Sequence, residues 1–132
     1  MKTNRKSAWT PRPKHLKAGV TAQKFRRMAL RLPGALEAAH MGHPDFRVNG
    51  KIFATLGCPD QQSGMVKLTP KQQAAFVRAQ PAVFDPCSGV WGRRGSINVR
   101  LGAVTDGTLR LALLAAWRNT APKPVGRELP DE

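Results

Sequence analysis

His43-Pro-Asp-Phe-Arg-Val-Asn-Gly-Lys-Ile-Phe-Ala-Thr-Leu56 is the stretch that decides the fold, because an Asn-Gly pair separates two apolar runs. Asn49-Gly50 tolerates the positive φ angles that a two-residue type I′ hairpin turn requires. The pattern therefore predicts two antiparallel strands. A two-residue loop places Val48 opposite Lys51, whereas a three-residue loop changes the pairing and puts Arg47 and Lys51 on one face.

With the two-residue loop, the hairpin has one aromatic face and one mixed face, since side chains alternate along a strand. The aromatic face holds Phe46, Val48 and Phe53. The mixed face holds Arg47, Ile52 and Ala54. We expect the aromatic face to point into the core.

Helix and strand signals come before and after the hairpin. Thr21 is the expected N-cap of an amphipathic helix that ends at Pro33-Gly34. Residues 36–40 fit a short edge strand, and residues 65–68 fit a further hairpin-connected strand. Thr69-Pro70 then supplies an N-cap and a first helical residue for a second helix, which ends at Pro81.

The C-terminal half continues with a strand and a helix. Residues 96–101 alternate apolar and polar side chains, which predicts a half-buried strand, and Phe84 before it is an expected core residue. A last helix is predicted over residues 108–119. The order of elements is helix, three strands, helix, about two strands, helix. Short connections favour an α+β two-layer domain, an antiparallel sheet with helices on one face.

Charge is the strongest feature of the composition. The 132 residues include 22 Lys and Arg against 8 Asp and Glu, a formal net charge of +14. We interpret residues 1–20 as a basic disordered arm, residues 21–123 as the domain and residues 124–132 as a flexible tail. Polyanions are the expected partners of so basic a chain, although the arm also fits a merely solvated tail.

The compartment is inferred from the cysteines and the N-terminus. Only two cysteines occur, Cys58 and Cys87, and no apolar segment follows the basic start, so we expect a cytoplasmic protein. The longest apolar run, residues 111–117, is too short to span a bilayer, and no membrane partner is predicted. A transit peptide is a weaker alternative, since two prolines interrupt the basic start.

Two basic groups stand out within the domain. In Trp91-Gly-Arg-Arg-Gly95, glycines would let a backbone approach a phosphate and the guanidinium groups of Arg93 and Arg94 would bind its oxygens. The alternative is that Trp91 packs on the sheet while the arginines cap a turn. Cations on the predicted strands would extend the same surface: Arg47, Lys51, Lys67 and Arg100. These residues, with Trp91, form the predicted nucleic-acid site.

A second basic group lies on the first helix. Lys24, Arg27 and Arg31 are spaced i, i+3 and i+7, which puts them in one stripe with no acid between them. We interpret this stripe chiefly as a solvated helix face and leave it out of the predicted site.

Catalytic and metal-binding chemistry has little support. His40, His43 and Asp45 include zinc-ligand types, but Cys58 and Cys87 lack partners at Cys-x-x-Cys spacing, so neither a metal site nor a cofactor is predicted. Asp45 is expected to order the entry to the hairpin by bonding backbone N–H groups or Arg47. No catalytic residues are predicted, and the protein is not expected to be an enzyme.

Three stretches resemble the MmcQ/YjbR-like family, in the family's order. They are Gly42-His-Pro-Asp-Phe-Arg-Val-x-Gly-Lys-x-Phe-Ala-x-Leu56, Trp91-Gly-x-x-Gly95 with Val99-x-Leu101, and Ala116-Trp117-Arg118 with Ala121-Pro122-Lys123. The resemblance covers about residues 21–123. It implies a small α+β fold of α-β(3)-α-β(2)-α type and a DNA-binding function without a catalytic set. The chain departs from the family pattern at Ser96, where an aromatic residue is common.

The expected function is non-enzymatic binding of nucleic acid, double-stranded DNA in particular, through phosphate contacts with little base specificity. The alternative is a protein-interaction or chaperone-like module that binds an acidic protein partner. The chain is expected to be a monomer or a weak dimer.

Overall fold

The Asn49-Gly50 hairpin forms as predicted in the computed structural model, which describes residues 19–122. Strand β2 (His43–Val48) pairs antiparallel with β3 (Lys51–Leu56), and Val48 lies opposite Lys51 across a two-residue turn. Asn49 and Gly50 adopt φ angles of 55° and 75°, which are the left-handed values that a type I′ turn needs. The predicted basic arm (apart from Gly19 and Val20) and the predicted tail lie outside the described residues.

A β-bulge in this hairpin corrects the predicted assignment of one residue to a face. Arg47 pairs with Ile52 but Phe46 pairs with Ala54, so Phe53 is an extra residue on β3. As a result Phe53 and Ala54 are both fully buried in the core. Ala54 was predicted to share a face with Arg47 and Ile52, and that prediction is wrong because simple alternation does not allow for the bulge.

The other elements follow in the predicted order. Before and after the hairpin lie α1 (Ala22–Leu30), β1 (Leu36–His40), β4 (Ser63–Val66), α2 (Pro70–Ala79), β5 (Phe84–Pro86), α3 (Gly89–Arg93), β6 (Ile97–Arg100) and α4 (Asp106–Thr120). The strands form one antiparallel sheet in the order β1-β2-β3-β4-β6-β5, which confirms the predicted fold class. The Gly- and Arg-rich segment that was expected to be a turn contains the short helix α3.

Side-chain caps explain where three of the helices begin. Thr21, Thr69 and Thr105 each accept a hydrogen bond from the backbone N–H three residues later. At Thr69 the Gln72 side chain also bonds back to the cap N–H, which completes a capping box. Thr105 rather than a later residue is the last cap, so α4 begins at Asp106, two residues before the predicted start.

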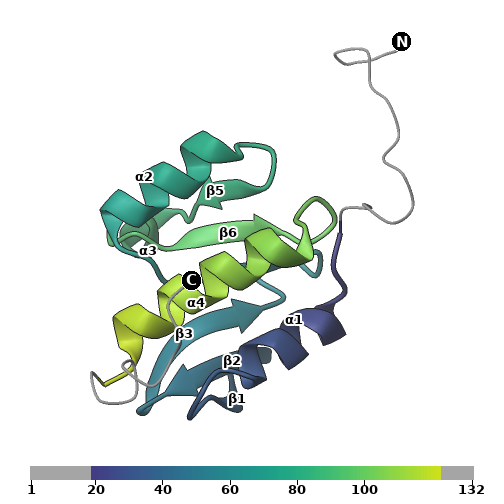
Figure 1. Ribbon diagram of the computed structural model, residues 1–132, viewed down its shortest axis with the longest axis vertical. Coiled ribbons are helices and arrows are strands. Elements are labelled where there is room, and N and C mark those ends of the chain that lie inside the picture. The colour runs from purple at the N-terminus through teal and green to yellow at the C-terminus, as the bar shows by residue number, and fades with distance from the viewer. Residues whose placement is uncertain (1–18, 123–132) are drawn as a thin grey trace.

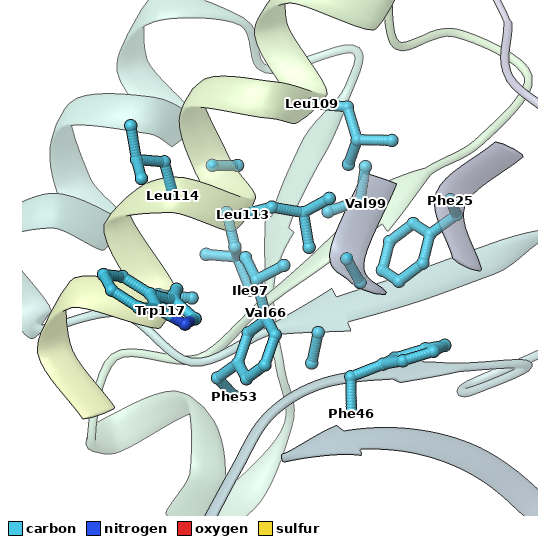
Figure 2. Close-up of a cluster of buried hydrophobic side chains, with 14 of the residues drawn as sticks. Phe25, Phe46, Phe53, Val66, Ile97, Val99, Leu109, Leu113, Leu114 and Trp117 are labelled. Atoms are coloured by element: carbon cyan, nitrogen blue, oxygen red, sulfur yellow. The ribbon is translucent and has the colours of Figure 1, made fainter. Parts of the chain in front are cut away.

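Helices α1, α2 and α4 cover one face of the sheet, and the core lies between the two layers (Figure 1). Figure 2 shows Phe25 of α1 and Trp117 of α4 directed toward Phe46, Phe53 and Val66 of the sheet. The Trp117 indole N–H donates to the Pro33 carbonyl at 2.9 Å, so this buried ring also satisfies its polar atom. We call this half of the molecule the helical side.

The opposite face of the sheet is called the open face here. Paired residues of an antiparallel sheet share a face, so the register places His40, Asp45, Thr55, Met65 and Asn98 there. The helical side and the open face therefore offer two separate surfaces for binding.

The first described residues already belong to the domain. The Gly19 N–H donates to the Val104 carbonyl at 2.7 Å, and the Val20 N–H donates to the Leu101 carbonyl at 2.8 Å. These two residues were assigned to the basic arm, whereas their backbone is hydrogen-bonded to the segment between β6 and α4. Among residues 19–122, no helix combines the length and the hydropathy needed to cross a bilayer.

Candidate nucleic-acid interface and open-face groove

A groove with a volume of about 470 Å³ lies on the helical side, between α1 and α4. Its lining is mostly basic: Lys24, Arg27, Met28, Arg31, Asp106, Gly107 and Arg110. The helical spacing of the α1 stripe directs its three cations to the same side of the helix, and α4 adds Arg110 from across the groove. We call this feature the α1–α4 groove.

The positive charge of this groove is only partly neutralised. Asp106, the one acid in the lining, forms an ion pair with Lys24. Among the described residues, neither Arg27 nor Arg31 forms an ion pair, and both are exposed. Positive charges gathered in a concave surface raise the local potential and attract anions.

Charge is distributed unevenly between the two layers. Residues 19–122 contain 14 Lys and Arg against 5 Asp and Glu. Helices α1, α2 and α4 with the cap of α1 hold eight of these cations and one acid: Lys24, Arg26, Arg27, Arg31, Lys71, Arg78, Arg110 and Arg118, with Asp106. The other four acids lie on the strands or their loops, and one of them, Glu37 of β1, forms an ion pair with Arg26 of α1. The helical side is therefore the more basic side of the domain.

The predicted site residues are the remaining six cations together with Trp91, and they do not form one patch. Trp91 and Lys67 do lie together, with Lys67 Nζ 5.3 Å from the centroid of the indole ring. Arg93 ends α3 and Arg94 is its C-cap, and both side chains are exposed. Lys67 and Trp91 therefore lie together at the α3 end of the open face, and Arg93 and Arg94 are exposed where α3 ends.

The other three predicted phosphate contacts, Arg47, Lys51 and Arg100, lie elsewhere in the domain. Arg47 bonds to Asp45 on the open face. Lys51 pairs with Val48, which points to the core side, so it lies on the opposite face of the hairpin from Arg47. Arg100 lines a small groove that also contains Asp60 and Asp85. Two carboxylates therefore share this groove with the Arg100 guanidinium group.

The glycines of Trp91-Gly-x-x-Gly95 have an internal role. A Cβ on Gly92 would lie 1.7 Å from the Cys87 carbonyl oxygen, and one on Gly95 would lie 2.2 Å from the Leu68 carbonyl oxygen. Gly95 also has a φ of 117°, which favours glycine. Both residues are buried, so their lack of a side chain allows close packing inside the domain, and the approach of a phosphate to this segment stays a prediction.

Asp45 organises the strands at the hairpin entry, as predicted. Its buried carboxylate accepts hydrogen bonds from Arg47 Nε at 2.7 Å and Arg47 Nη2 at 3.0 Å, and its Oδ2 lies 2.7 Å from His40 Nδ1. The bonds from Arg47 lower the pKa of the Asp45 carboxyl, and His40 adds to this effect against the opposing effect of burial. The same bonds raise the pKa of the Arg47 guanidinium. This cluster joins β1 to β2.

A second groove, about 340 Å³ in volume, lies on the open face. Ile52, Thr55, Met65 and Asn98 form its floor, which comes from β3, β4 and β6. Its walls come from three connecting segments: His40 and Met41, then Cys58 and Pro59, then Cys87, Ser88 and Trp91. We call it the open-face groove.

The cysteines in this groove are both free thiols. Cys87 Sγ donates to Asn98 Oδ1 at 3.2 Å. Burial, together with nearby Cys58 and Asp85, raises the pKa of the Cys87 thiol to about 11. Cys87 is therefore a protonated thiol at neutral pH rather than a nucleophile. No group of three or more potential metal ligands occurs within residues 19–122.

The sequence signal for the α1–α4 groove was present but incomplete. The i, i+3, i+7 spacing of Lys24, Arg27 and Arg31 was recognised, but it was interpreted chiefly as a solvated helix face. Arg110 is about eighty positions away along the chain, and only the packing of α4 beside α1 brings it to the stripe.

Fold and charge together define a small two-layer α+β domain with a basic helical side. The family model described as YjbR matches residues 30–119, and the protein belongs to this family. This confirms the family resemblance found in the sequence. The crystal structure of Deinococcus radiodurans protein DR2400, with a DUF419 domain, is similar at a TM-score of 0.66 and 20% identity over 85% of this chain and 91% of that one. At 20% identity, this similarity shows only that the two proteins share a fold. No curated protein matches the sequence.

Proposed function

We propose that this YjbR-family protein binds nucleic acid, preferentially double-stranded DNA, through non-enzymatic phosphate contacts in the α1–α4 groove. The observation that carries the proposal is the convergence of four cations from two helices in one groove, whose lining contains one acid, Asp106. Guanidinium groups bind phosphate oxygens in bidentate geometry, and three of the four cations are arginines.

The remaining charge of the chain supports the same partner. Arg118 of α4 and the two cations of α2 belong to the helical side as well, although they do not line the groove. The first twenty residues add six Lys and Arg and no acid. Contacts of this kind hold the phosphate backbone without reading base edges, so little sequence specificity is expected.

Salt dependence tests the mode of binding. A fluorescent random-sequence duplex is titrated with the full-length chain at several salt concentrations. With about six phosphate contacts, affinity should fall about a thousandfold between about 50 and 200 mM salt. A flat salt response, or no binding at low salt, would contradict the proposal.

Matched triple variants test the location. Arg27→Ala/Arg31→Ala/Arg110→Ala should lower the slope of log affinity against log salt by about 2 to 3. The control, Arg93→Ala/Arg94→Ala/Arg100→Ala, removes the same charge from the other side and should change the slope much less. Equal losses would mean that net charge rather than the groove governs binding, and a larger loss in the control would place the site at the α3 end. Circular dichroism checks that both variants fold.

An acidic protein is the rival partner, since carboxylates also bind arginine clusters. The ratio of absorbance at 260 and 280 nm after purification in low salt separates the two. Co-purified nucleic acid raises this ratio, whereas a ratio typical of protein together with failure to bind the duplex would favour the protein partner.

A further inference from the structure

The open-face groove is independent of the proposed DNA contacts, because the sheet separates it from the α1–α4 groove. Its volume of about 340 Å³ lies within the range of small-molecule pockets, about 300 to 1,000 Å³. Three connecting segments enclose it, and the strands close its base. A site of this kind accommodates one small molecule rather than a broad protein surface.

A buried hydroxyl group at the base of the groove lacks a partner. Thr55 is 2% exposed, lines the groove, and its Oγ1 has no hydrogen bond within the described residues. Most buried polar side-chain atoms in proteins do have a partner, and leaving one without is costly. A ligand atom in the groove would satisfy this hydroxyl.

The bulge in β3 is what places Thr55 there. Ile52 and Thr55 are three residues apart, so regular alternation would put them on opposite faces. The extra residue Phe53 shifts the register, so that Ile52 pairs with Arg47 and Thr55 pairs with Asp45 on the same open face. Bulges redirect side chains in this way near binding sites.

The rest of the lining indicates the chemistry of the ligand. Trp91 is 49% exposed and offers an indole ring, and the thioethers of Met41 and Met65 pack well against aromatic rings. The lining itself contains no Lys, Arg, Asp or Glu, and Lys67, whose Nζ lies 5.3 Å from the centroid of the Trp91 ring, is not part of it, which favours a neutral molecule. Asn98 Oδ1 accepts a hydrogen bond from the Cys87 thiol, which leaves the Nδ2 amide group as the donor that Asn98 offers to the groove it lines.

We propose that the open-face groove binds a neutral, planar heteroaromatic small molecule, its ring against Trp91 and Met65 and its polar edge on Thr55 Oγ1 and Asn98 Nδ2. A cyclic amide edge, with one N–H and one carbonyl, matches this pair of protein groups, because a hydroxyl accepts the N–H and the amide donates to the carbonyl.

The probe for a direct test is quinazolin-4-one, a neutral bicyclic compound with such an edge. It is titrated into the ¹⁵N-labelled full-length chain while ¹H–¹⁵N spectra are recorded. Saturable shifts are expected at the Trp91 indole N–H and at the amides of Thr55, Met65 and Asn98, with a Kd of about 0.1 to 1 mM, typical of a fragment. The absence of saturable shifts up to about 5 mM would overturn the proposal.

Two variants and a control separate a specific site from general apolar adsorption. Thr55→Val keeps the side-chain shape and should weaken binding about five- to tenfold. Trp91→Ala should weaken it at least about tenfold. Leu111→Ala, on α4 and 50% exposed, removes an apolar side chain of similar exposure from the helical side and should leave the Kd unchanged. Equal affinity in all three variants would overturn the proposal, and a well-dispersed spectrum confirms that each one is folded.

Discussion

The helical side and the open face each carry a groove, but they differ sharply in charge. The α1–α4 groove is lined by four cations and one acid, whereas the lining of the open-face groove contains no Lys, Arg, Asp or Glu. The cause is where the acids lie. Four of the five acids among residues 19–122 are on the strands or their loops, and only Asp106 is on α1, α2 or α4.

The comparison shows that a count of charges does not locate a basic site. Arg47 carries the same formal charge as Arg27, yet Asp45 bonds to it directly, and Asp60 and Asp85 line the same small groove as Arg100. On the helical side no acid pairs with Arg27 or Arg31 among the described residues. The surplus of positive charge therefore lies on the side of the sheet that the helices cover.

The largest expected effect comes from disturbing the α3 wall of the open-face groove. Gly92→Ala would place a Cβ 1.7 Å from the Cys87 carbonyl oxygen, a backbone atom that has little room to move. We expect a loss of more than about 3 kcal/mol in the free energy of unfolding, measured by urea denaturation. Gly102→Ala is the control, because a Cβ there meets no atom within 4 Å. Similar stability of the two variants would refute the packing role of Gly92.

A smaller loss of stability is expected when one acid on each side of the sheet is replaced. Asp45→Asn removes the charge that binds Arg47 and His40 and should lower the free energy of unfolding by about 2 to 3 kcal/mol. Asp106→Asn removes an exposed acid that pairs with Lys24 and should change it by less than about 0.5 kcal/mol. If the two variants lost equal stability, the contrast between a structural acid on the open face and a solvated one on the helical side would be wrong.

The lowered pKa of Asp45 also predicts that the stability of the protein depends on pH. The pKa of Asp45 lies below its ordinary value of 3.8 in the folded protein, so its contribution to stability is present above that value. It is lost as the pH falls through the lower, folded-state pKa. Thermal midpoints of the wild type and Asp45→Asn should therefore differ most at neutral pH and converge in the acid range. A difference that stays constant down to about pH 2 would contradict this assignment.

The smallest effect concerns the thiols of the open face and leaves the fold intact. With a pKa of about 11, Cys87 is almost entirely protonated at pH 8, whereas Cys58 is exposed. We expect iodoacetamide to modify Cys58 at least about tenfold faster than Cys87, as followed by peptide mass spectrometry. In strong urea the two rates should become similar. Equal rates in the folded protein would mean that the wall around Cys87 is open to solvent.

Much of the fold was predictable because its signals are local. The Asn49-Gly50 turn, the caps at Thr21 and Thr69, and the alternation of Ile97, Val99 and Leu101 each depend on a few neighbouring residues. The bond between Asp45 and Arg47 was likewise predictable, since the two residues are two positions apart on one strand. The family resemblance was confirmed by the match over residues 30–119.

The two candidate sites were less predictable because they depend on long-range geometry. Alternation put Ala54 on the outer face, and the bulge at Phe53 reversed that placement and turned Thr55 toward the groove. The glycines at 92 and 95 were interpreted as room for a phosphate, whereas the structure shows them packed against the backbone carbonyl groups of Cys87 and Leu68. Neither effect has a signature in local composition.

The sequence by itself determined the hairpin, the order of elements and the excess of positive charge, because turn preference, capping and net charge depend only on residue identity and spacing. Tertiary structure decided which charges lie together. It brings Arg110 to the stripe on α1 and carboxylates to Arg47 and Arg100, and electrostatic energy depends on those distances rather than on order along the chain.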